Sequence, residues 1–135
     1  KTIHEQPVWI FHSNGVSEEL RSKWLQLGAK LFECEVDDFG ISLKGVMQKL
    51  SDQGITRLLC EGGSKLAASL IRSELVDEIA TFHGGVTIGA DGFPSIGELG
   101  VYALIDAKRW RLDKTISFDT EVLNIWHPTD KYSKN

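Results

Sequence analysis

The sharpest chemical feature of this 135-residue sequence is Glu61-Gly62-Gly63, which lies between a predicted strand and a predicted helix. The carboxyl ends of strands are where open α/β sheets bind ligands. Paired glycines let the backbone approach a ligand closely, and the free N–H groups at a helix start favour phosphate. Because a carboxylate repels anions, Glu61 suits a hydrogen bond to a polar substrate better. Taken alone, strand-Gly-Gly-helix is equally compatible with a simple tight turn.

Two further segments are candidates for ligand binding. Ser13 follows the first predicted strand, where its hydroxyl could bind a cofactor or only shape the Ser13-Asn14-Gly15 turn. The glycine-rich residues 84–92 could form a second lip of a binding cleft or a structural loop. The sequence contains no G-x-G-x-x-G fingerprint, no P-loop and no metal-ligand spacing of histidine or cysteine. The residues alone therefore leave the kind of site open.

Composition narrows the class of protein. A hydrophobic fraction of 41% and a charged fraction of 25% are ordinary for a globular domain, and the length predicts a single domain over residues 1–135. The net charge is −4 and the 15 Lys and Arg residues are dispersed, which argues against nucleic-acid or membrane partners. Two cysteines are too few for a disulfide framework and suit a reducing cytoplasm. We expect a cytoplasmic protein with a small-molecule substrate.

The apolar periodicity predicts the order β-α-β-α-β-α-β, then a loop and a hairpin. Strands are expected at residues 8–11, 30–36, 57–60 and 78–82. Helices are expected after the candidate N-cap Ser17 up to Gly28, from Leu43 up to Gly54, and at residues 65–72. Residues 83–100 are expected to form a loop, and the two hairpin strands within 102–126 to separate near Asp113-Lys114. Cys34 and Cys60 are expected to be small buried residues of strands. Right-handed crossovers then imply an α/β fold with a mainly parallel central sheet, flanking helices and a C-terminal antiparallel hairpin.

Several segments together resemble one family. Leu58-Leu59-Cys60-Glu61-Gly62-Gly63-Ser64-Lys65-Leu66-Ala67 resembles the L-V-E-G-G-x-x-L-A signature of the C-terminal reductase domain of the riboflavin-biosynthesis bifunctional deaminase/reductase. Leu75-Val76-Asp77-Glu78-Ile79 resembles its L-V-D-E-L stretch, Ile88-Gly89-Ala90-Asp91-Gly92 its L-G-G-D-G, and Gly97-Glu98-Leu99-Gly100 its G-G-L-G. Because the motifs occur in order at family spacing, from about Pro7 to Pro128, they are more specific together than any one alone.

The resemblance implies a dihydrofolate-reductase-like fold, NADPH as cofactor and an NADPH-dependent oxidoreductase activity. The implied reaction reduces 5-amino-6-(5-phosphoribosylamino)uracil to the ribitylamino product. By the same resemblance, Glu61 would contact the substrate and Ser13 the cofactor. The remaining cofactor-binding residues would be Gly62, Gly63, Ser64, Lys65, Leu66, Ala67, Ala68 and Ser69. The resemblance identifies no catalytic residue.

The sequence also departs from the family pattern. Lys65 stands where the family often has Thr, and could add a charge beside a cofactor phosphate. His83-Gly84-Gly85 replaces an apolar-Ala-Pro sequence. The family's first strands, with most of its substrate-binding residues, have no counterpart ahead of Lys1, so we expect an N-terminally truncated piece. No deaminase H-x-E or P-C-x-x-C signature is present.

Two alternatives remain at this point. The first is a related dihydrofolate-reductase-like reductase of another heterocycle, such as a pterin. The second is a non-catalytic oligomeric binding module, in which the apolar strands carrying Trp110 and Trp126 pair across a two-fold axis. Because a truncated sheet would expose an unpaired edge and apolar surface, we expect a homodimer or poor solubility.

Overall fold

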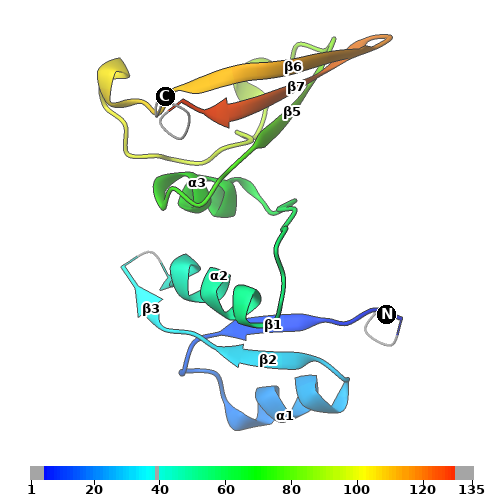
Figure 1. The fold of residues 1–135 in the computed structure, drawn as a ribbon, viewed down its shortest axis with the longest axis vertical. Helices are drawn as coiled ribbons and strands as arrows, with labels where there is room; N and C mark the ends of the chain where they lie inside the picture. The colour runs from blue at the N-terminus through cyan, green and yellow to red at the C-terminus, as the bar shows by residue number, and fades with distance from the viewer. Residues whose placement is uncertain (1–4, 39, 130–135) are drawn as a thin grey trace. The chain divides into compact units, whose positions relative to one another are not determined.

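The computed structural model describes residues 5–38 and 40–129, and the chain forms two compact units, Lys1–Cys60 and Glu61–Asn135. Both units combine helices with a small sheet (Figure 1). The single-domain organisation expected for residues 1–135 stays a prediction.

The first unit contains a parallel pair of strands with a helix on each side (Figure 1). Strand β1 (Trp9–His12) pairs in parallel with β2 (Lys30–Glu33), and α1 (Glu18–Gln26) connects them. The short strands β3 (Val36–Asp37) and β4 (Gly40–Ile41) form an antiparallel pair before α2 (Leu43–Asp52). This crossover confirms the predicted β-α-β order up to β2, whereas the antiparallel pair β3 and β4 before α2 was not predicted.

Local sequence explains where the helices of the first unit begin and end. The hydroxyls of Ser17 and Ser42 accept hydrogen bonds from backbone N–H groups of the first turns of α1 and α2, as N-caps do. The chain leaves α1 and α2 through Gly28 and Gly54, whose φ angles of 89° and 81° favour glycine. The prediction that Ser17 caps a helix is confirmed.

The second unit places one helix with a three-stranded antiparallel sheet. Helix α3 (Ser64–Arg72) precedes β5 (Ile79–Gly84), and the hairpin strands β6 (Trp110–Phe118) and β7 (Glu121–Pro128) complete the sheet in the order β5-β7-β6. The apolar face of α3 is formed by Ala68, Leu70 and Ile71, which are buried. Because Ile71 shares a small cavity of about 60 Å³ with residues of the hairpin, the end of α3 packs close to this sheet.

The strand predicted over residues 57–60 is wrong. The segment belongs to no strand pair among the described residues, and Leu58 and Leu59 are 55% and 80% exposed. A strand is held by hydrogen bonds to a neighbour rather than within itself, so an apolar run without a partner remains extended but unpaired. Cys60 is accordingly exposed, against the expectation, whereas Cys34 is buried as predicted.

The predicted hairpin division near Asp113-Lys114 is also wrong. Strand β6 continues through these residues with an irregularity between Leu112 and Lys114, and the chain reverses after Phe118 instead. Asp119 lies in the reversal at a φ of 47°, a left-handed conformation that Asp tolerates better than most residues. Charged side chains at 113–114 are accommodated because β6 is an edge strand.

Candidate functional site

The start of α3 presents backbone donors that the protein leaves unused. Gly63 is the N-cap residue, with an extended conformation (φ −66°, ψ 171°) and no side chain that could cap the helix. Its carbonyl accepts hydrogen bonds from the N–H groups of Leu66 and Ala67. Within the described part of the chain, no group accepts from the N–H of Ser64 or Lys65. These two donors, at the positive end of the helix dipole, are suited to an anion.

The two glycines before α3 serve different purposes. A Cβ on Gly62 would lie 2.6 Å from Cδ2 of Leu66, so the first glycine allows the Leu66 side chain to fold back over the turn. A Cβ on Gly63 would meet nothing within 4 Å. The second glycine is therefore not demanded by packing, and its missing side chain keeps the helix start accessible.

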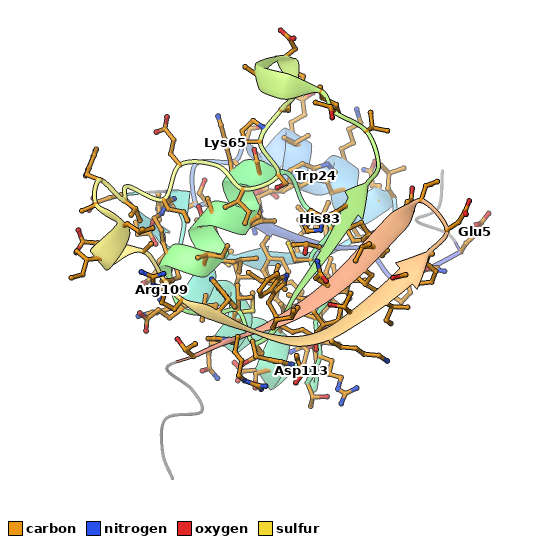
Figure 2. All side chains as sticks on the ribbon, turned by 90° about the horizontal axis from the view of Figure 1, so that it is seen from above. Glu5, Trp24, Lys65, His83, Arg109 and Asp113 are labelled. Atoms are coloured by element: carbon orange, nitrogen blue, oxygen red, sulfur yellow. The ribbon has the colours of Figure 1, made fainter. Side chains whose placement is uncertain are left out.

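The residues predicted to bind ligand divide by exposure. Glu61, Gly62, Gly63, Lys65 and Leu66 are exposed, whereas Ser64, Ala67 and Ser69 are half-buried and Ala68 is buried. Figure 2 shows Lys65 on α3, and no carboxylate of the described residues pairs with its ammonium group. The accessible part of the predicted set is thus its first turn, where a cationic side chain adds to the two free N–H donors.

A segment distant in sequence is held against α3. The N–H of Gly97 donates to the Ser64 carbonyl oxygen over 2.9 Å, and a Cβ on Gly97 would lie 3.1 Å from that oxygen. The Arg72 guanidinium donates to the Glu98 carbonyl oxygen at 2.5 Å and to the Ser69 hydroxyl at 3.0 Å. No sequence motif singles out Arg72, although the motif beginning at Gly97 marks the segment that it contacts.

Ser13 lies in the first unit, directly after β1. It is half-buried, and Nδ1 of the buried His12 lies 2.8 Å from the Ser13 carbonyl oxygen. The neighbouring Asn14 lines an open groove of about 790 Å³, together with residues 33–36 after β2 and one side of α2. This groove lies where the carboxyl ends of two parallel strands meet, the usual ligand-binding edge of an α/β sheet.

The glycine-rich residues 84–92 combine a structural base with an exposed tip. The N–H of Gly85 donates to the carbonyl oxygen of Thr120 in the hairpin turn, and a Cβ on Gly85 would lie 3.3 Å from that oxygen. Beyond this anchor, Gly89–Asp91 forms a single exposed 3-10 turn. Gly85 is therefore explained by packing and Gly89 by its φ of 71°, whereas a Cβ on Gly84 would meet nothing within 4 Å. Gly84 and the exposed tip remain candidates for ligand contact.

Neither a metal site nor a membrane-spanning helix emerges from the residues that the structure describes. Within 5–38 and 40–129, no three His, Cys, Asp or Glu side chains gather as a metal ion would require. No helix in the same part of the chain is long and apolar enough to cross a bilayer.

Comparison with known proteins connects this site to a family. The family model described as the RibD C-terminal domain matches residues 2–123. A protein of Archaeoglobus fulgidus is 38% identical over 66 residues, covering 47% of this chain and 30% of its own length. One of Aquifex aeolicus is 26% identical over 128 residues, covering 94% of this chain and 56% of its own length. Both are named 2,5-diamino-6-ribosylamino-4(3H)-pyrimidinone 5′-phosphate reductase.

Solved structures extend the comparison to the fold. Acinetobacter baumannii RibD matches with a TM-score of 0.71 at 22% identity, over 88% of this chain and 31% of that chain. This likeness confirms the predicted dihydrofolate-reductase-like α/β fold class. The chain spans between 30% and 56% of the lengths of these three proteins, so their activities are attributes of longer polypeptides.

Proposed function

This chain belongs to the RibD C-terminal domain family, and we propose that it serves the NADPH-dependent reduction of a phosphorylated ribosylaminopyrimidine in riboflavin biosynthesis. The names of the two curated relatives support this substrate class. The particular substrate that we propose is 5-amino-6-(5-phosphoribosylamino)uracil. Its reduction to the ribitylamino product adds a hydride and a proton, and NADPH is oxidised to NADP⁺.

The observation that carries the proposal is the open start of α3. A dinucleotide cofactor brings several phosphate oxygens, and the unused N–H groups of Ser64 and Lys65 are donors for such oxygens. The exposed Lys65 ammonium adds a charge that the family pattern often lacks. The residues present therefore fit a phosphate-bearing cofactor.

When bound, NADPH supplies the hydride, and the chain's own residues supply binding and orientation. We propose that the first turn of α3, in the second unit, holds the cofactor phosphates. Ser13, in the first unit, stays a predicted cofactor-binding residue. The roles of Leu66, Ala67, Ala68 and Ser69 would be carried by their backbone or by packing, because Ala68 is buried and the Ser69 hydroxyl accepts from Arg72.

Glu61 is proposed to bind substrate. Its carboxylate is exposed, and no described residue donates a hydrogen bond to it or pairs with it. An ionised carboxylate accepts hydrogen bonds only, so it can receive the N–H and O–H groups of an aminopyrimidine carrying a ribosyl chain. Because a carboxylate repels phosphate, we propose that Glu61 faces the substrate and not the cofactor phosphates.

The direct test is binding, followed by turnover. We expect NADPH to quench tryptophan fluorescence and to raise the melting temperature of the purified protein; at about 100 times Kd the added stability is about 2.7 kcal/mol. NADH provides the comparison for cofactor choice. Oxidation of NADPH should then depend on 5-amino-6-(5-phosphoribosylamino)uracil, with the 2,5-diamino pyrimidinone phosphate assayed beside it.

The outcomes separate the proposed function from its alternatives. Turnover only with a pterin or another heterocycle would indicate a different reductase of the same fold. NADPH binding without turnover of any substrate would favour a binding module. The absence of any change in tryptophan fluorescence at about millimolar NADPH, far above the range of ordinary cofactor affinities, would contradict the proposal.

We also propose a cytoplasmic homodimer, which sedimentation equilibrium and cell fractionation would test.

A further inference from the structure

We propose that Arg72 and Gly97 form a clamp that positions the cofactor-binding start of α3. The clamp consists of two consecutive loop residues, Gly97 and Glu98, and of the α3 residues that they contact, which are Ser64, Ala68 and Arg72. Arg72 and Gly97 are positioning residues, because neither is expected to touch the cofactor. The inference rests on the proposed function, since it assigns the clamp's effect to NADPH binding.

The contacts of the clamp span α3 from its first turn to its last. At the first turn, Gly97 donates its N–H to Ser64 and lies close to Ala68, with its Cβ position 3.6 Å from the Ala68 Cβ. At the last turn, Arg72 donates to the next residue of the same segment, Glu98. Two consecutive residues of one loop therefore bind opposite ends of a nine-residue helix.

The chemistry of the two contacts makes them stiff. Arg72 bridges the Glu98 carbonyl and the Ser69 hydroxyl with two separate nitrogens of a planar guanidinium. Hydrogen bonds from a charged donor are stronger than those between neutral groups. At the other contact, a Cβ on Gly97 would lie 3.1 Å from the Ser64 carbonyl oxygen, a backbone atom that cannot move aside as a side chain can. A side chain at residue 97 would consequently displace the segment from α3 by a few tenths of an ångström.

The effect should reach the cofactor through Ser64. The carbonyl that Gly97 contacts and the N–H that we propose for phosphate belong to the same residue. A rotation or shift of this first turn would redirect the N–H groups of Ser64 and Lys65 together. Small displacements of groups that orient a ligand are costly, because hydrogen bonds depend steeply on angle and distance.

The experiment compares four variants of the purified protein. Arg72→Gln removes the long charged donor, Arg72→Lys keeps the charge without the fork, and Gly97→Ala adds one methyl group at the close contact. Arg109→Gln is the matched control, because Arg109 also donates to a backbone carbonyl, that of Leu104, and has no hydrogen bond to the first turn of α3 within the described residues. Each variant is measured for NADPH affinity, for the KM of NADPH against kcat, and for amide exchange at residues 64, 65 and 97.

We expect Arg72→Gln and Gly97→Ala to weaken NADPH binding about five- to tenfold, the loss of roughly one good hydrogen bond. Exchange at residue 97 should be faster, KM should rise more than kcat falls, and Arg72→Lys should recover part of the affinity. Arg109→Gln should stay within about twofold of wild type.

Three results would overturn the inference in distinguishable ways. Unchanged amide exchange in both Arg72→Gln and Gly97→Ala would show that no clamp acts on α3. Faster exchange with wild-type NADPH affinity would show a structural contact without a positioning role. A wild-type protein that does not bind NADPH would overturn the proposed function, and the positioning role would fall with it.

Discussion

Helices α2 and α3 differ in the residue that caps their first turn. At α2, the Ser42 hydroxyl accepts the N–H of Gly45, and α1 uses Ser17 in the same manner. At α3, Gly63 offers no side chain, and the N–H groups of Ser64 and Lys65 have no acceptor within the described residues. The N–H groups of Leu43 and Lys44 in α2 likewise have no acceptor among the described residues, so the difference lies in the cap: a serine side chain stands over the first turn of α2, and no side chain stands over that of α3.

The open start costs the fold little. Glycine is only a few tenths of a kcal/mol worse than Ser at an N-cap, whereas an apolar residue costs about 1 kcal/mol. Water can satisfy the free donors of α3 because Gly63 and Lys65 are exposed. The difference between the two helix starts therefore concerns ligand binding more than stability, and variants at these starts should separate cofactor affinity from the free energy of unfolding.

The largest effect is expected from Gly63→Asp. The backbone at 63 suits any residue and a Cβ meets nothing within 4 Å, so the new carboxylate can cap α3 without strain. It would occupy the phosphate donors and repel the phosphate itself. We expect NADPH affinity to fall about 100-fold, equivalent to about 2.7 kcal/mol, while the melting temperature stays level or rises. Titration and thermal unfolding measure both.

Gly63→Ser is the companion variant, because it adds a cap without a charge. Its loss of affinity should be smaller than that of Gly63→Asp. If both variants bind NADPH like wild type, the start of α3 is not the phosphate site, and its contrast with α2 carries no functional meaning.

Lys65→Ala should have the next largest effect. Lys65 and Lys44 are both the second residue of their helices and both are exposed. Loss of a charged hydrogen bond to a phosphate should weaken NADPH binding about tenfold. Its dependence on salt should also become shallower, because one ionic contact is gone. Lys44→Ala is the control, and equal effects of the two variants would argue against a specific site at α3.

Ser42→Ala is expected to have a moderate effect on the free energy of unfolding and none on cofactor affinity. Removing the N-cap should lower the free energy of unfolding by about 1 kcal/mol. Affinity for NADPH, measured well below the melting temperature, should remain at the wild-type value. Chemical denaturation and fluorescence titration give the two numbers. A Ser42→Ala variant that keeps full stability but loses cofactor affinity would reverse the roles assigned to the two helix starts.

The smallest effect concerns the thiols that precede the two helices. Cys34 is buried before α2, and burial raises its pKa, an effect that the charge of Lys49 partly offsets. Below its ordinary pKa the thiol is protonated in both states and contributes nothing. As the pH rises further, it ionises first in the unfolded chain, so folding stability falls. Cys34→Ala should reduce this alkaline loss of stability, measured by denaturation over a pH series.

Cys60 gives the matching comparison, because it is exposed before α3. A thiol reagent should modify one cysteine in the native protein, at residue 60, and the second only after denaturation. Peptide mapping identifies the modified residue. Rapid native modification of Cys34 would show that the interior next to α2 opens more readily than its burial indicates.

Much of the local structure could be predicted from sequence, because helices are built from contacts between near neighbours. Residues within a few positions of one another determine three such features: the apolar spacing of α2, the Ser17 cap and the start of α3 after Gly63. Order and spacing of the motifs also gave the family, which matches residues 2–123.

The remaining features depend on partners that are distant along the chain. Residues 57–60 have a strand-like composition but no partner strand, and β6 continues through the polar residues 113–114 because its hydrogen bonds to β7 outweigh local preference. Cys60 is exposed for the same reason as its segment. A local sequence pattern could therefore not predict the unpaired segment 57–60, the continuous β6 or the exposed Cys60.

The candidate site likewise has features set by local sequence and features set by contacts between distant residues. The sequence by itself determined that Glu61-Gly62-Gly63 precedes a helix and that a lysine follows, since these are local properties. Only the tertiary structure decided that Gly63 leaves the helix start open, and that Gly97 and Arg72 hold opposite ends of α3 to one loop. A contact between residues 97 and 64 depends on how the chain folds back, and folding back is set by packing.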